Sequence, residues 1–359
     1  MAAMRPILYY SPAMGRVDFG AGHPFRGSRF DQFVKLLQAN GLEKDLDVRQ
    51  PLTATDADLA LVHTPEYVAH VREVEGYEGA LSIDTPVPRG MTDAVKFIVG
   101  GALAGAGSLA KGESELAMTF GGFHHAGVSN GEGFCVFNDV AIAARALIQR
   151  HEMKRVLVID TDAHQGNGTM DIFWEDPRVL FISIHQDPRT VYPGRGFASE
   201  IGAGEGRGFT INIPMPRFSG NAQWAHALDE IFVPVCAEFK PEAIIRNGGS
   251  DPFYADELTE LGLDFDGLAE VGRIVRSASD NGPRRLLDLM VSGYGDFVPY
   301  GWLALFAGVT GMQVDYSKYA RLVYPMPSRV PEATLERQTD AVVAEVRRNL
   351  AEFWPCLRK

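Results

Sequence analysis

The sequence predicts an α/β protein built around a parallel sheet, and two features of the 359-residue chain indicate this class. Short apolar runs of strand length recur along the chain, and most of them stop at chemically reactive residues. Stretches with helical spacing separate these runs, as the crossover connections of a parallel sheet require. Since no linker, charge block or repeat divides the chain, we expect residues 1–359 to form a single domain.

The expected elements follow one another in strand and helix alternation. Apolar runs that predict strands lie at 7–10, 116–120, 156–160, 179–184, 243–245 and 286–291. Apolar residues recur at helical spacing within 28–39, 94–110, 138–150, 265–278 and 332–353. A further helix is expected near Thr64, because Thr-Pro-Glu offers an N-cap and a first-turn proline. Residues 76–90 predict a loop.

Composition and charge argue against several classes of function. A chain that is 46% hydrophobic and 22% charged is an ordinary globular protein, and a net charge of -12 disfavours nucleic acid as a partner. The 3 cysteines lack C-x-x-C spacing, so neither a disulfide framework nor a thiolate metal site follows. The N-terminal segment has no signal-peptide core, and Lys96 and Ser108 interrupt the longest apolar stretch. We therefore expect a cytoplasmic protein without a membrane partner.

Reactive residues follow five of the expected strands. They are His124 and His125, then Asp160 with Asp162 and His164, then His185, Asp251 and Tyr294. Ligands of open α/β sheets bind beyond the carboxyl ends of the strands. The sequence therefore predicts a functional site at that edge of the sheet.

The segment that follows the third of these strands carries the strongest signal. Alternate side chains of an extended segment point to the same side, so a D-x-D-x-H spacing gathers Asp160, Asp162 and His164. Gly166 and Gly168 are expected to let the backbone turn tightly. A strand end with acidic turn residues is the structural alternative.

These residue types match the chemistry of a catalytic metal. Three ligands and an open position describe catalytic zinc, and Asp162, His164 and Asp251 would form an oxygen-rich example. Carboxylate and imidazole equally permit Fe2+, Co2+ or Mn2+. Such a metal activates water and polarises a carbonyl, so hydrolysis of an amide is within reach.

The adjacent histidines and the tyrosine add acid–base chemistry. His124 and His125 can supply a general base and a cationic group if each ring is oriented, and Asp160 and Asn167 are available for that. Tyr294 can donate a hydrogen bond to a developing oxyanion. The structural alternatives are a turn with two hydrogen-bonded histidines and a tyrosine used in packing.

Several motifs occur in a fixed order from Ile7 to Trp302. They are Gly122-Phe123-His124-His125-Ala126, Gly133-Phe134-Cys135-x-Phe137-Asn138-Asp139, Asp160-x-Asp162-x-His164-x-Gly166-Asn167-Gly168, Gly249-Ser250-Asp251 and Ser292-Gly293-Tyr294. Together they resemble the zinc-dependent histone deacetylase family, which includes bacterial deacetylase-like amidohydrolases and acetylpolyamine amidohydrolases. The resemblance implies an arginase/deacetylase fold, with a central eight-stranded parallel sheet flanked by helices and the active site at the C-terminal strand ends. It also implies hydrolysis of an N-acetyl group to acetate and a free amine.

The resemblance also implies a role for each matching residue. The Zn2+ ligands are Asp162, His164 and Asp251. His124 with Asp160 forms the electrostatic member of the histidine dyad, and His125 with Asn167 is the general base and later the acid. Tyr294 completes the oxyanion site. Phe134 and Tyr192, with Leu258 nearby, line the acyl-lysine channel, and an inner K+ site uses Asp160, Asp162, His164 and Ser183.

Two departures from the family pattern bear on mechanism and substrate. Asn167 stands where some relatives have Asp, which removes a charge from the dyad. Glu257 adds a carboxylate at the expected pocket rim, which is compatible with a cationic acetylpolyamine, whereas Leu258 and the aromatic pair are compatible with acetyl-lysine. A homo-oligomeric partner could narrow the channel.

Two other functions remain open from the sequence. A dimanganese ureohydrolase shares the implied fold, although it needs further bridging carboxylates and leaves the histidine pair unexplained. A non-catalytic module that binds an acetylated ligand would not require a general base.

Overall fold

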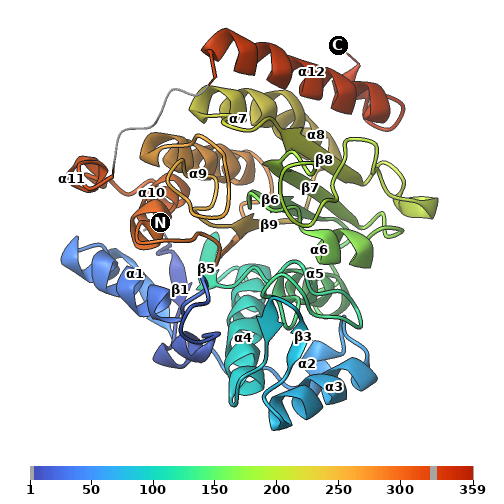
Figure 1. Ribbon diagram of the computed structural model, residues 1–359. Coiled ribbons are helices and arrows are strands. Elements are labelled where there is room, and N and C mark those ends of the chain that lie inside the picture. Colours follow the sequence, from blue (N-terminus) through green and yellow to red (C-terminus); the bar gives the residue numbers. More distant parts are fainter. Residues whose placement is uncertain (1–3, 324–329, 359) are drawn as a thin grey trace. The chain divides into compact units, whose positions relative to one another are not determined.

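The computed structural model describes residues 4–323 and 330–358 (Figure 1). Its main sheet has eight strands in the order β2-β1-β5-β10-β9-β6-β7-β8, which confirms the predicted eight-stranded sheet. The chain divides into two compact units. The first takes the described residues up to Lys154, with Gly166–Ile172 and Arg285–Val291; the second takes Arg155–Gln165, Phe173–Arg284 and the described residues from Ser292 onward. The expected single domain stays a prediction.

The first unit contains the strand order β2-β1-β5-β10. Its parallel strands are β2 (Asp47–Arg49), β1 (Ile7–Tyr9), β5 (Leu116–Phe120) and β10 (Leu286–Met290). Its helices are α1 (Ser28–Ala39), α2 (Asp56–Leu59), α3 (Pro65–Gly76), α4 (Met91–Ala110), α5 (Asp139–Gln149) and α6 (Asn167–Ile172), with the 3-10 turns η1 (Pro12–Arg16) and η2 (Glu43–Asp45). Each of the long helices lies where the sequence predicts one.

The Gly- and Ala-rich helix α4 packs against β5 and α5. A side chain at Gly105 would place its Cβ 2.6 Å from Leu287, so glycine permits this close approach. Among the described residues, α4 is the one helix long and apolar enough to cross a bilayer, and 61% of that apolar window is buried inside the protein. Its environment is that of a core helix.

The second unit contains the strand order β9-β6-β7-β8. Its parallel strands are β9 (Ala243–Gly248), β6 (Val156–Asp160), β7 (Val179–Gln186) and β8 (Thr210–Met215). Its helices are α7 (Asn221–Ala227), α8 (Val233–Phe239), α9 (Phe265–Asp280), α10 (Val298–Thr310), α11 (Ser317–Ala320) and α12 (Glu332–Leu350), with the π-helix η4 (Leu228–Phe232) and the 3-10 turns η3 (Gly204–Gly206) and η5 (Pro355–Leu357). Helix α12 lies along α7 and β8 (Figure 1).

Strand register brings polar residues to one edge of the sheet within the second unit. Asp160, the last residue of β6, is paired with Ser183 on β7 and with Asn247 on β9. All three side chains are buried. Because the strands are parallel, the loops that follow β6 and β9 leave from this same edge.

The structure differs from the sequence-based expectation in its shorter elements. Residues 76–90 are not only a loop, because β3 (Ala80–Ser82) and β4 (Thr85–Pro86) form an antiparallel hairpin within them. Asp84 holds this hairpin by accepting hydrogen bonds from the hydroxyls of Ser82 and Thr85. Such short strands carry too few residues for a periodic pattern.

Candidate functional site

Three predicted metal ligands lie together in the second unit. Asp162 and His164 belong to the loop after β6, and Asp251 follows β9; one donor atom from each lies within 4.8 Å of the others. His164 Nδ1 is 3.2 Å from Asp162 Oδ1 and 3.0 Å from Asp251 Oδ2. All three residues are buried. The donor atoms therefore converge in a place that solvent does not reach freely.

The electrostatics of this cluster favour the binding of a proton or a metal cation. Burial raises the pKa of Asp251 well above its usual range, and the charge of Asp162 raises it further. Burial acts to lower the pKa of His164, but hydrogen bonds to the two carboxylates and their charges raise it to about 10. Two carboxylates and an imidazole thus retain a proton at neutral pH. A divalent cation would replace that proton and satisfy the same oxygens and nitrogen, so the donor set fits a metal.

Backbone and hydroxyl groups hold the ligand side chains in place. Asp251 Oδ2 accepts a 3.1 Å hydrogen bond from the backbone N–H of Ala163, and its Oδ1 accepts a 2.6 Å hydrogen bond from the Ser292 hydroxyl. Asp162 Oδ1 accepts a 2.8 Å hydrogen bond from the backbone N–H of His164. These contacts fix the carboxylate orientations before any ligand binds.

The residues predicted to bind K+ also lie in the second unit, on β6, its following loop and β7. Asp160 is fully buried, and its Oδ1 accepts hydrogen bonds from the backbone N–H of Asp162 at 3.2 Å and from Asn247 Nδ2 at 3.1 Å. The Ser183 hydroxyl lies 2.9 Å from His185 Nδ1. Occupancy by K+ stays a prediction, since backbone carbonyls complete such a site.

His185 has a structural environment. Its Nε2 lies 2.9 Å from the carbonyl oxygen of Gly196, and burial lowers its pKa to about 4. A side chain at Gly196 would place its Cβ 2.5 Å from the same ring. The histidine is therefore neutral and enclosed at neutral pH, with both ring nitrogens engaged.

Tyr294 also belongs to the second unit, and its ring is edge-on to that of His164, with centroids 6.3 Å apart. Asp256 Oδ2 accepts a 2.7 Å hydrogen bond from the backbone N–H of Tyr294, and Asp256 Oδ1 accepts one of 2.9 Å from the backbone N–H of Leu258. Burial raises the pKa of Asp256 to about 7, although these two hydrogen bonds act to lower it. Glu257 and Leu258 could be picked out from the sequence, but this contact of Asp256 could not, because a backbone N–H has no sequence signature.

The first unit contains the histidine pair. His124 and His125 follow β5, are buried, and have ring centroids 4.1 Å apart. Asn138 donates from Nδ2 to the carbonyl oxygen of Ala126 at 2.9 Å and to that of His124 at 3.3 Å. Asp139 accepts from the backbone N–H of Phe123 at 2.7 Å. The Asn-Asp pair that begins α5 therefore holds the backbone on both sides of the histidines.

Asn167 orients one of these histidines within the first unit. His125 Nδ1 lies 2.7 Å from Asn167 Oδ1, and Asn167 Nδ2 donates a 2.8 Å hydrogen bond to Glu132 Oε1. An amide oxygen only accepts hydrogen bonds, so Nδ1 of His125 carries the proton and Nε2 is the unprotonated nitrogen of the neutral ring. Glu132 was not singled out by sequence reasoning; its place between two glycines before Phe134 gave no separate signal.

Two glycines in the motifs are required by close packing. A Cβ at Gly168 would lie 2.4 Å from the carbonyl oxygen of Ala126, and a Cβ at Gly133, where φ is +57°, would lie 2.5 Å from the His125 ring. The expectation that Gly166 and Gly168 make a tight turn is wrong for Gly168. That residue lies in α6 and has helical conformation, so its role is to let backbones approach.

The residues predicted to line a substrate channel are divided between the units. Phe134 is in the first unit, has φ of +67°, and its ring is 4.5 Å from that of His23. The hydroxyl of Thr85 accepts a 3.0 Å hydrogen bond from its backbone N–H. Tyr192 and Leu258 are in the second unit and are 39% and 41% exposed, and their role in a channel stays a prediction.

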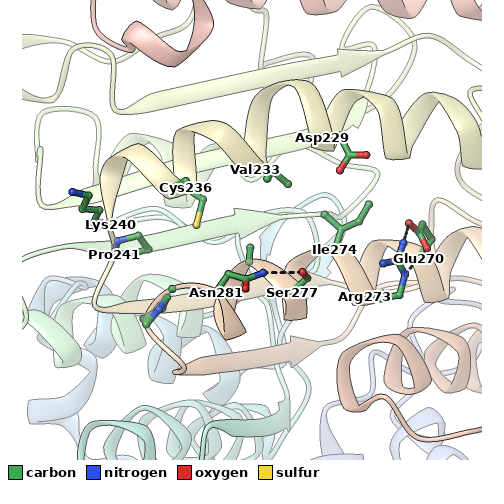
Figure 2. A pocket seen from close by; sticks show the side chains of 14 residues that line it. Asp229, Val233, Cys236, Lys240, Pro241, Glu270, Arg273, Ile274, Ser277 and Asn281 are labelled. Atoms are coloured by element: carbon green, nitrogen blue, oxygen red, sulfur yellow. Dashed lines mark hydrogen bonds and ion pairs between the residues drawn. The ribbon is translucent and has the colours of Figure 1, made fainter.

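A separate cavity lies beside α8 and α9 in the second unit (Figure 2). Its volume is about 680 Å³, and its lining includes Cys236, Lys240, Glu270 and Arg273. Glu270 and Arg273 pair with each other on α9. None of the residues predicted for catalysis or metal binding lines this cavity.

Comparison with known proteins gives consistent results. The histone deacetylase domain profile matches residues 23–308. A probable deacetylase of Archaeoglobus fulgidus is 33% identical over 349 residues, covering 94% of this chain and 95% of the relative. The acetoin utilization protein AcuC of Bacillus subtilis is 35% identical over 282 residues, covering 76% and 72%. A histone deacetylase-like amidohydrolase of Pseudomonas aeruginosa is 31% identical over 298 residues, covering 82% and 78%.

The fold is also found in a solved structure. The crystal structure of the HDA15 HD domain superposes with a TM-score of 0.85, covering 99% of this chain and 97% of that chain at 24% sequence identity. This likeness confirms the predicted arginase/deacetylase type of α/β fold.

Proposed function

Because the chain belongs to the histone deacetylase family, we propose that it is a zinc-dependent amidohydrolase that hydrolyses an N-acetyl amide to acetate and a free amine. The observation that carries this proposal is the buried convergence of Asp162, His164 and Asp251. Membership supports a deacetylase or amidohydrolase, and the ligand cluster supports the dependence on a metal.

The three side chains of this cluster would hold the metal. Two carboxylates and an imidazole are ligands that Zn2+ accepts, and the absence of cysteine among them is typical of a catalytic rather than a structural zinc. Bound Zn2+ would supply Lewis acidity to the acyl carbonyl and to water. Buried charge in the cluster and its hydrogen bonds to Ala163 and Ser292 support a preformed site.

His125 is the general base in this proposal. Its Nδ1–H donates a hydrogen bond to Asn167 Oδ1. The unprotonated Nε2 is then available to take a proton from water and later to give it to the departing amine. His124 acts as the electrostatic partner, with Asp160 as its orienting carboxylate. Asn167, the hydrogen-bond acceptor of His125, follows the proposed ligand His164 by three residues in the sequence.

Tyr294 is the proposed oxyanion donor. Its phenol would donate a hydrogen bond to the oxygen of the former carbonyl as negative charge develops there. Asp256 supports this role because it holds the tyrosine through the backbone N–H, a contact that does not involve the phenol.

The proposed substrate is an acetyl-lysine-like side chain or a small acetylated amine. Phe134, Tyr192 and Leu258 offer apolar surface for an aliphatic stem. An acetylpolyamine is the second candidate, favoured by the exposed carboxylate of Glu257 and the net charge of -12. The same charge supports a protein without a nucleic-acid partner. K+ held by Asp160, Asp162, His164 and Ser183, and a cytoplasmic location, complete the proposal.

The test is hydrolysis of an acetyl-lysine reporter by zinc-loaded protein, with and without a chelator. Specificity constants would be compared among acetyl-lysine peptides, acetylpolyamines and small aryl amides. We expect turnover that the chelator abolishes and one metal ion per chain. Absence of chelator-sensitive turnover on the whole panel would overturn the proposal, two bound Mn2+ ions would indicate a ureohydrolase, and binding without turnover would indicate a non-catalytic module.

A further inference from the structure

We propose that Glu132 is a positioning residue that acts through Asn167 on His125. Its carboxylate supports the general base indirectly, with the Asn167 amide between the two side chains. The inference rests on the proposed function, in which His125 is the base. It concerns the departure at position 167, where this chain has an amide in place of the carboxylate found in some relatives.

The hydrogen-bond directions form a continuous relay. A carboxylate only accepts hydrogen bonds, so the 2.8 Å contact at Glu132 Oε1 must come from the Asn167 amide N–H. The amide oxygen then faces His125 and accepts from Nδ1–H at 2.7 Å. Glu132 therefore determines which end of the Asn167 amide meets the imidazole, and with it the tautomer of His125.

The surrounding backbone holds Glu132 close to the histidine. The residue is half-buried, and its carbonyl oxygen accepts a 2.9 Å hydrogen bond from the backbone N–H of Cys135. The next residue, Gly133, lies so close to His125 that a Cβ there would be 2.5 Å from the ring. Asn130 Nδ2 lies 3.5 Å from the same Oε1, a weaker contact than that of Asn167.

The relay supplies two effects that Asn167 alone lacks. A neutral amide can present either its oxygen or its nitrogen to an imidazole, and only the first supports a base at Nε2. The charge of Glu132 also polarises the amide toward the histidine, which stabilises the imidazolium that forms when the base takes a proton. The support is weaker than direct contact with a carboxylate because the charge lies one residue further away.

A double-mutant cycle at positions 132 and 167 tests the relay, because the second substitution is expected to offset the loss of kcat that the first one causes. Asn167→Asp places two carboxylates against each other at a hydrogen-bonding distance, so we expect it to lower kcat by tenfold or so when Glu132 is present. In the double variant, the amide introduced by Glu132→Gln can donate to the carboxylate introduced at position 167, so we expect recovery of most of that loss. A role of position 167 independent of Glu132 would give the same effect in both backgrounds.

The single variants separate orientation from charge. Glu132→Gln keeps an oxygen that can accept from Asn167, and we expect it to lower kcat only a few-fold. Glu132→Ala removes both effects, and we expect a loss of about tenfold in kcat with KM little changed. Glu66→Gln is the matched control, because it removes the same charge from an exposed position of α3. We expect it to change neither constant.

A measurement without catalysis separates this inference from the proposed function. In protein labelled with 15N in its imidazole rings, the His125 signals are identified by their loss in His125→Gln. We expect a protonated Nδ1 and an unprotonated Nε2 in the wild type at a pH where the ring is neutral, and a mixture of tautomers in Glu132→Ala. The same tautomer in both proteins, or failure of Glu132→Gln to rescue Asn167→Asp, would overturn the relay. If no acyl amide is hydrolysed, the proposed function fails while the tautomer result still decides the relay.

Discussion

The backbone N–H of Tyr294 donates a 2.7 Å hydrogen bond to Asp256. Burial raises the pKa of the Asp256 carboxyl to about 7. The tyrosine is thus fixed through its main chain, between Gly293 and Gly295, which have φ of +122° and +97°. Removal of the phenolic oxygen alone leaves this attachment intact. Tyr294 is therefore a position at which chemistry can be changed with little change in structure.

We predict that Tyr294→Phe retains the metal and loses turnover by a factor on the order of a hundred, because one oxyanion donor is removed. Turnover on an acetyl-lysine reporter and metal content by mass spectrometry check this. Tyr300→Phe, which alters a tyrosine stacked on Tyr319 in the same unit, is the control and should keep full turnover. Equal turnover in Tyr294→Phe and wild type would rule out the assigned role.

Asp251→Asn should reduce zinc affinity by more than about 100-fold, because it removes a charged ligand. The metal-free variant should be at least as stable as the metal-free wild type, since burial and the neighbouring Asp162 raise the pKa of the Asp251 carboxyl. Metal content after dialysis and melting temperature with and without added Zn2+ test both statements. Asp296→Asn, at an exposed position, should behave like the wild type. Unchanged zinc binding by Asp251→Asn would exclude it as a ligand.

His63 makes a defined contribution to the pH dependence of stability. It is buried, its Nε2 accepts a 2.9 Å hydrogen bond from the backbone N–H of Asn138, and burial lowers its pKa to about 4. Between about pH 6.5 and about pH 4 the unfolded chain binds a proton at this residue that the folded protein does not. His63 therefore makes its full contribution to the free energy of unfolding above its pKa in the unfolded chain. That contribution is lost as the pH falls toward its pKa in the folded protein.

We predict that the stability difference between wild type and His63→Gln changes by about 2 kcal/mol in favour of the variant when the pH falls from about 7 to about 5. Glutamine can accept the same hydrogen bond but does not titrate. Urea unfolding of both proteins at the two pH values measures the difference. A difference that is the same at both pH values would mean that folding does not lower the pKa of His63.

Gly168→Ala should destabilise the first unit by about 2 kcal/mol or more, because its Cβ would lie 2.4 Å from one backbone oxygen and 2.5 Å from another. Alanine otherwise favours a helix over glycine, by about 1 kcal/mol. Gly76→Ala is the matched control: this residue also lies in a helix, and its added Cβ would meet nothing within 4 Å. Denaturant midpoints should fall for the first variant and hold or rise for the second. A more stable Gly168→Ala protein would contradict the packing argument.

The central strands could be predicted because buried parallel strands are continuous apolar runs. Strand β2 has only three residues, Asp-Val-Arg, and gives no such run. Strand β8 alternates polar and apolar residues and contains Pro214, as an edge strand can, so its pattern resembles a loop. Within the eight-stranded sheet, the missed strands are therefore those at the two ends of the strand order.

Some residues of the candidate site could also be predicted from the sequence, and others could not. Asp162, His164 and Asp251 could be chosen because each follows a strand that ends at the functional edge of the sheet. Glu132 and Asp256 could not, since their contacts depend on how loops fold back onto an amide side chain and a backbone N–H. Sequence order determines which strand precedes a residue, whereas loop conformation determines what its side chain meets.

The pairing of β5 with β10 has a consequence for synthesis on the ribosome. Leu116 of β5 is in register with Leu286 of β10, and both strands belong to the first unit. One edge of β5 therefore lacks its native partner until residue 286 has left the exit tunnel. An apolar strand edge that waits this long is open to mispairing with other nascent chains. The first unit can therefore complete its strand pairing only after the segment Arg285–Val291 has been synthesised.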